Sequence, residues 1–252
     1  MQKLLGYMRK AIQEFDMISD GDVIAVGVSG GKDSLVLLNG LVLLRRFIGI
    51  DYRIVSITLD PQFGGIPGNY QPIADLCHEL DVECHIIPTH IGEIVFDVRK
   101  EPNPCSLCAR MRRGALHDAA KEYGCNKIAL GHHFNDAVET FIMNLFNEGR
   151  IGCFSPVSYL SRKDITLIRP MVFAPEKEVR KAALKNELNI VKSKCPADGH
   201  TNREVTKNFI AEMDKKSRGF SDRIFGAMRR SGIDGWGGVN FEPRKRNKEK
   251  PE

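Results

Sequence analysis

A short apolar run that ends in a glycine loop and leads straight into an amphipathic stretch constrains this fold more than any other feature. Residues 23–28 read VIAVGV, residues 29–34 read SGGKDS, and residues 35–47 carry helical periodicity. This order predicts a strand, a tight turn and a helix. A helix N-terminus at such a turn presents unpaired backbone N–H groups and a partial positive charge, so the loop is expected to bind phosphate.

Alternation of strand and helix patterns continues through the first two thirds of the chain. Further strands are expected at residues 53–59, 84–87 and 127–130, with helices between them. Strands that alternate with helices predict an α/β fold, with an open parallel sheet and helices on both faces.

After Arg150 the pattern changes to a loop, a strand at residues 166–168 and two helices over residues 176–188 and 202–216. The expected organisation is therefore a sheet domain with an N-terminal helix, a small helical C-terminal part, and a flexible basic tail. We place these parts at residues 1–165, 166–230 and 231–252.

Composition narrows the class of protein. Of the 252 residues, 42% are hydrophobic and 27% are charged, which is typical of a globular chain rather than a disordered one. The longest apolar stretch, residues 40–50, is interrupted by Arg45 and Arg46, so no membrane span is expected. The N-terminus has no signal-peptide pattern, which favours a cytoplasmic location.

A net charge of +5 permits a polyanionic partner without requiring one, and the sequence is compatible with a homodimer.

The glycine loop consists of Ser29, Gly30, Gly31, Lys32, Asp33 and Ser34. Its two glycines let the backbone approach a phosphate closely, its two serines offer hydroxyl donors, and its lysine adds a cation. Two common nucleotide motifs are excluded. A Walker A loop would need glycine in place of Val26 and a hydroxyl residue in place of Asp33, and the dinucleotide fingerprint would need glycine in place of Ser29.

Two cysteines, Cys105 and Cys108, open the predicted helix at residues 107–123, where the helix dipole favours thiolates. Cys195, in a loop between predicted helices, can supply a third thiolate. Three thiolates suit an iron–sulfur cluster with one open iron, whereas a zinc site would take Asp198 or His200 as its fourth ligand. A redox pair is less favoured. The remaining cysteines lie in or beside apolar segments and are expected to fill the core: Cys77, Cys84, Cys125 and Cys153.

A third pattern, GHHFNDAVET at residues 131–140, ends one strand and begins a helix at the same rim as the glycine loop. His132 there can contact phosphate or move a proton. Asp136 and Glu139 have capping-box spacing, which alone would explain both carboxylates. Asp60 ends the second strand, where a role as a turn or helix-cap aspartate would explain it.

The glycine loop resembles the pyrophosphate-binding motif of the PP-loop (N-type) ATP pyrophosphatases, Ser-Gly-Gly-x-Asp-Ser, at every defined position. With the PCxxC, LGHHxxDxxET and Ile168-Arg169-Pro170 patterns, residues 1 to about 215 are similar to the tRNA 2-thiocytidine synthetases. That resemblance implies that ATP adenylates a pyrimidine carbonyl, in cytidine of the anticodon loop, and that sulfur delivered by a [4Fe–4S] cluster replaces the oxygen.

The resemblance also implies roles for individual residues. The cluster ligands are Cys105, Cys108 and Cys195, which with Lys32 and Asp33 form the catalytic set, and Asp33 helps to hold Mg²⁺. The nucleotide is bound by the glycine loop with Asp60, His132 and Asp136. The partners are tRNA and a sulfur donor such as a cysteine desulfurase.

Two other functions remain open from the residues alone. A lysidine-type tRNA ligase keeps the adenylation of cytidine but needs no cluster. A non-enzymatic zinc-binding nucleotide- or RNA-binding module would use the three cysteines and His200 as ligands.

Overall fold

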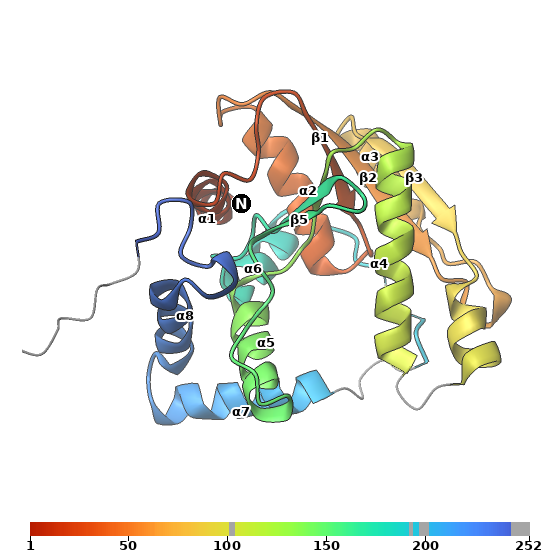
Figure 1. Ribbon diagram of the computed structural model, residues 1–252. Coiled ribbons are helices and arrows are strands. Elements are labelled where there is room, and N and C mark those ends of the chain that lie inside the picture. Colours follow the sequence, from red (N-terminus) through yellow and green to blue (C-terminus); the bar gives the residue numbers. More distant parts are fainter. Residues whose placement is uncertain (101–103, 192–193, 197–201, 243–252) are drawn as a thin grey trace, which may run out of the picture.

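The computed structural model describes residues 1–100, 104–191, 194–196 and 202–242, which form one sheet, flanking helices and a helical C-terminal part (Figure 1). The strands are β1 (Asp22–Gly27), β2 (Tyr52–Asp60), β3 (Glu83–Pro88), β4 (Lys127–Ala129), β5 (Val157–Leu160) and β6 (Ile165–Ile168). The helices are α1 (Gln2–Glu14), α2 (Lys32–Arg45), α3 (Gln71–Glu79), α4 (Pro104–Glu122), α5 (Phe134–Asn147), α6 (Glu176–Lys185), α7 (Asn202–Lys216) and α8 (Phe220–Ser231). Shorter helical segments are Phe63–Gly65, Glu93–Arg99 and Ile233–Gly235.

The sheet has the order β3-β2-β1-β4-β6-β5, and only the β5–β6 pair is antiparallel among the described strands. Alternate residues of β1 face two separate cores. Ile24 and Val26 pack with α1, α2 and α6, whereas Ala25 packs with α4 on the other face. The prediction of a mostly parallel sheet covered on both faces is therefore confirmed.

Three expectations about the C-terminal third need correction. The boundary at residue 165 would split β6 from the sheet, although β6 pairs with β4 and with the unpredicted strand β5. Helix α8 was also not predicted. The flexible tail cannot begin at residue 231, because the Trp236 side chain is fully buried and its Nε1 donates to the Phe154 carbonyl at 2.8 Å. Residues 243–252, which hold the basic tail, lie outside the described residues.

Strand order reverses direction between β1 and β4, because the chain runs from β1 outward to β2 and β3 and then returns to β4 on the other side of β1. Ligands of open α/β sheets bind in the crevice at the carboxyl ends of strands at such a point. Both the glycine loop after β1 and the histidine pair after β4 lie there. Within the described chain, no helix is both long and apolar enough to span a bilayer.

Candidate functional site

The glycine loop joins β1 to α2 and is braced by its own serines. Ser34 Oγ donates to the Gly31 carbonyl at 3.0 Å, and the Ser29 and Ser34 hydroxyls lie 3.3 Å apart. Gly30 has φ of +83°, and a Cβ there would lie 2.7 Å from the Cβ of Val191. Only glycine fits that position without strain. The loop is thus preformed, with the N-terminus of α2 behind it.

Lys32, the loop cation, is held by two carboxylates. Its Nζ lies 3.0 Å from Asp33 Oδ2 and 3.2 Å from Oε1 of Glu176, the first residue of α6. Lys207 of α7 reaches the other oxygen of Glu176 at 3.0 Å. Burial raises the pKa of Glu176, but Lys207 and Lys32 outweigh it and lower the pKa to about 2. The carboxylate therefore stays ionised between two ammonium groups.

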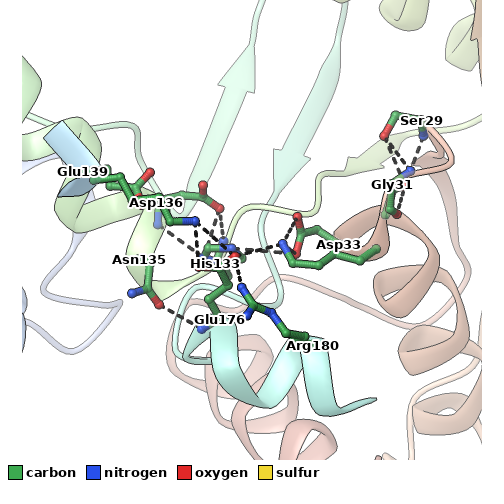
Figure 2. Close-up of polar contacts among 12 residues, drawn as sticks. Ser29, Gly31, Asp33, His133, Asn135, Asp136, Glu139, Glu176 and Arg180 are labelled. Carbon is green, nitrogen blue, oxygen red and sulfur yellow. Dashed lines mark hydrogen bonds and ion pairs between the residues drawn. The ribbon is translucent and has the colours of Figure 1, made fainter. Parts of the chain in front are cut away.

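The motif after β4 brings His133 between the glycine loop and α5 (Figure 2). His133 is the N-cap of α5: its Nδ1 accepts from the Asp136 N–H at 3.3 Å, and its own N–H donates to Asp136 Oδ2 at 2.8 Å. The capping box is therefore His133–Asp136, and the expected Asp136–Glu139 box was wrong by one turn. With Nδ1 as acceptor, a neutral His133 carries its proton on Nε2, which lies 3.7 Å from Asp33 Oδ1.

The two acidic side chains of α5 bind a residue far along the chain. Arg203, in the first turn of α7, places Nη2 2.6 Å from Asp136 Oδ1 and Nε 2.8 Å from Glu139 Oε2. Glu139 is buried, so the pair satisfies a carboxylate that would otherwise be costly there. The start of α7 is thus fixed onto the cap of α5.

His132 lies beside Arg169, whose Nε donates to His132 Nδ1 at 3.3 Å. Burial and the Arg169 charge lower the pKa of His132 to about 4, so the ring is neutral at neutral pH. Gly131 allows the close approach of this segment to the loop after β1, since a Cβ there would lie 3.2 Å from the Asp33 carbonyl carbon.

Asp60 is buried at the end of β2, and its carboxylate organises the loop that follows. Oδ1 accepts from the Gln62 N–H at 3.1 Å and from the Tyr70 hydroxyl at 3.4 Å, and Oδ2 accepts from the Gly68 N–H at 2.9 Å. Of the two roles expected for Asp60, these contacts are those of a turn aspartate. A direct contact with adenosine stays a prediction.

Two cavities meet at the rim of the sheet, and Ser29 and Arg112 line both. The first, of about 330 Å³, lies over the ends of β1, β2 and β4 beneath α4, with Leu59 and Leu130 in its wall. The second, of about 470 Å³, lies beside the loop after Asp60. Both volumes are typical of small-molecule sites.

The three candidate ligands lie near one another but do not form a ready metal site. Burial raises the pKa of Cys108 despite Arg112, and Cys195 and Cys105 raise it further, which places the three thiols in one neighbourhood. Among the described residues, however, no group of three or more His, Cys, Asp or Glu side chains is arranged to hold a metal ion. Asp198 and His200, the proposed zinc ligands, lie outside the described residues. The residue types fit a thiolate-bound group, but their arrangement is not preformed.

The other cysteines behave as core residues in part. Cys77, Cys125 and Cys153 are buried, as expected, whereas Cys84 is half-buried. Sequence reasoning missed Glu176, Lys207 and Arg203 as parts of the site. Glu176 carried a weak signal, because it begins a helix directly after a proline, but no spacing pattern links α7 to α5.

Comparisons with known proteins agree with this geometry. A family model described as a PP-loop domain matches residues 5–213. A tRNA-cytidine(32) 2-sulfurtransferase from Citrifermentans bemidjiense is 40% identical over 210 residues, which cover 82% of this chain and 81% of that protein. Its namesake from Geobacter sulfurreducens is 36% identical over 219 residues, which cover 86% and 84%.

A solved structure is also similar. The U34-tRNA thiolase NcsA from Methanococcus maripaludis, determined with its [4Fe–4S] cluster, superposes with a TM-score of 0.73 at 25% identity. The match covers 89% of this chain and 77% of that one.

Proposed function

The chain belongs to the PP-loop family and, within it, to the tRNA-cytidine 2-sulfurtransferases, and on that premise we propose that it thiolates cytidine 32 of tRNA at the expense of ATP. The observation that carries the proposal is the meeting of three segments at two adjoining cavities. These segments are the glycine loop, the end of β4, and the part of α4 that follows Cys105 and Cys108 and contributes Ala109 and Arg112 to the lining.

ATP binds with its phosphates on residues 29–34 and its adenosine in the cavity over the ends of β1, β2 and β4. The N-terminus of α2 and Lys32 stabilise the phosphates. Asp33 holds Mg²⁺, as its place beside the phosphates and its carboxylate chemistry favour. Asp136, tied to His133, fixes the cap of α5 beside Asp33. Neutral His132 lines the same cavity and has its Nε2 proton free to donate.

The reaction activates a poor leaving group. The C2 carbonyl oxygen of cytidine attacks the α-phosphorus of ATP, and pyrophosphate leaves. A sulfur nucleophile then adds at C2, and AMP departs with the former carbonyl oxygen. Carbonyl, ATP and hydrosulfide thus yield thiocarbonyl, AMP and pyrophosphate, with the hydrosulfide proton ending on pyrophosphate at neutral pH. No electrons are exchanged.

The sulfur centre comprises Cys105, Cys108 and Cys195. A [4Fe–4S] cluster held by three thiolates supplies an open iron for a sulfur ligand. The similar solved structure, NcsA, carries a [4Fe–4S] cluster, which favours iron over zinc here. The sulfur comes from a donor such as a cysteine desulfurase.

A homodimer and a cytoplasmic location remain our predictions. Neither the ligase nor the zinc module is favoured by the named relatives.

Cysteine substitutions test this assignment. Anaerobically purified Cys195→Ala should lose iron and acid-labile sulfide and make no 2-thiocytidine, yet bind ATP as the unchanged protein does. Cys125→Ala, which removes a buried thiol after α4, is the matched control and should retain both. Full thiolation by Cys195→Ala would reject its ligand role, and an iron-free protein that thiolates tRNA would reject the cluster.

A further inference from the structure

The cavity beside the loop after Asp60 is left over once ATP has been placed. It adjoins the adenosine cavity at Ser29 and Arg112, so any molecule within it borders the position of the α-phosphate. Its wall also includes Lys194, the neighbour of Cys195. The base that is to be thiolated reacts first with the α-phosphorus and then with sulfur, so a cavity between these two groups is a suitable place for it.

The lining of this cavity contains aromatic and aliphatic side chains together with two cations. Phe63 and Tyr70 provide rings, Ile66 and Ile190 provide aliphatic surface, and Arg112 and Lys194 provide positive charge. Burial, together with the Asp60 carboxylate, raises the pKa of Tyr70, so its hydroxyl stays protonated and donates to Asp60. The Asp60 carboxylate is in turn occupied by the loop. The cavity therefore offers flat apolar surface and cations.

Two of these lining residues are exposed although they are large and apolar. Ile66 is 61% exposed and Ile190 is 52% exposed, and they come from segments more than 100 residues apart in the chain. Exposed large aliphatic side chains that line the same cavity favour a surface that a ligand covers. We call Ile66 and Ile190 the rim of this cavity. A free small molecule does not need exposed side chains there, whereas a base presented by a macromolecule passes over them.

We propose that this cavity receives the acceptor pyrimidine, unstacked from single-stranded RNA, with its base against Phe63 and Tyr70 and its backbone phosphates near Arg112 and Lys194. Sequence-specific recognition of RNA commonly places splayed bases on aromatic side chains, and cations neutralise the adjoining phosphates. The inference rests on the proposed function, since it assigns the place of the nucleotide that is to be thiolated.

A photocrosslink tests the location directly. The RNA is a single tRNA transcript with 5-iodocytidine at position 32, used in place of bulk tRNA from cells that lack the enzyme. The complex of this transcript with the protein is irradiated. The expected adduct lies in the peptide that spans Phe63 and Tyr70. An adduct confined to peptides outside the cavity would overturn the proposal.

Substitutions at the rim separate this proposal from the proposed function. Ile66→Asp and Ile190→Asp place a carboxylate where the RNA passes, on exposed side chains whose replacement costs little stability. Each should raise the KM for tRNA by roughly tenfold or more, equivalent to about 1.4 kcal/mol, and leave ATP affinity unchanged. Ile151→Asp, at a residue 71% exposed outside the cavity lining, is the control and should leave the KM unchanged.

The outcomes are distinct. If the unchanged protein releases no pyrophosphate with tRNA, the proposed function fails. If it does, and both rim variants keep its KM for tRNA, only the placement of the base fails. An increase in KM for the rim variants with an unchanged control supports the placement.

Discussion

The Nε2 atom of His133 lies 3.7 Å from Oδ1 of Asp33, although the two residues belong to motifs 100 positions apart in the chain. The imidazole caps α5 through Nδ1 and faces the glycine loop through Nε2. One side chain thus links the helix after β4 to the aspartate that is proposed to hold Mg²⁺.

His133→Asn is expected to separate these two tasks. Asparagine is a good N-cap, so the free energy of unfolding should change by less than about 1 kcal/mol. Its side chain is, however, too short to approach Asp33. The rate of tRNA-dependent pyrophosphate release should fall by on the order of tenfold, or about 1.4 kcal/mol of activation free energy. An unchanged rate with an intact α5 would show that His133 acts only as a cap.

The glycine loop offers a matched pair of substitutions. Gly30→Ala introduces a Cβ at positive φ and against Val191, so it should destabilise the protein by about 1–3 kcal/mol in urea denaturation. At Gly31 a Cβ would meet only Ser29 Oγ, at 3.5 Å. Gly31→Ala should therefore keep stability and weaken ATP binding, measured by calorimetry, because the methyl group crowds the phosphate. Equal loss of stability in both variants would contradict this reading of the loop.

The lowered pKa of His132 predicts a pH dependence of stability. An unfolded histidine titrates near pH 6.5, whereas burial and Arg169 hold His132 in the folded chain at about 4. The unfolded state therefore binds more protons as pH falls through this interval, and folding weakens by roughly 2 kcal/mol between pH 7 and pH 5. His132→Gln should flatten that part of the urea-denaturation profile. An NMR titration of His132 near 6.5 would refute the premise.

Glu176 predicts a second, more acidic interval. Its pKa of about 2 lies below that of an unfolded glutamate, so its contribution is present at neutral pH and is lost as pH falls from about 5 to 2. The shift corresponds to on the order of 3 kcal/mol. Glu176→Gln should remove this part of the acid unfolding curve, while Glu122→Gln, an exposed control at the end of α4, should not. Coincident curves for Glu176→Gln and the unchanged chain would contradict the assigned ion pairs.

Sequence predicted the parts of this fold that local patterns encode. The short apolar runs and the glycine loop placed β1, β2, β3 and β4 and the turn after β1 within one or two residues. The antiparallel strand β5 was missed although its partner β6 follows it directly in the chain, because β5 is an edge strand whose four residues are half-buried or exposed and form no continuous apolar run. Trp236 was assigned to a flexible tail, yet it fills the core beside Phe15 and Phe225.

The site residues likewise divide into those that a local sequence pattern predicts and those that only tertiary packing brings together. Residues 29–34, His132 and Asp136 were predicted because they follow strands that end at one rim. Arg203, Lys207 and Glu176 reach that rim only through the packing of α6 and α7, for which the sequence holds no spacing rule. The proximity of Cys195 to the CxxC pair likewise depends on tertiary structure, so its role as a ligand remains a proposal for the cysteine variants to decide.

The path of one oxygen atom tests the central claim most directly. A tRNA transcript made with [2-¹⁸O]cytidine triphosphate is converted anaerobically with ATP and sulfide, and the AMP and pyrophosphate are analysed by mass spectrometry. Attack of the cytidine carbonyl on the α-phosphorus predicts one ¹⁸O in each AMP formed with 2-thiocytidine and none in pyrophosphate. Unlabelled AMP alongside thiolated tRNA would contradict carbonyl adenylation, and with it the function assigned to this site.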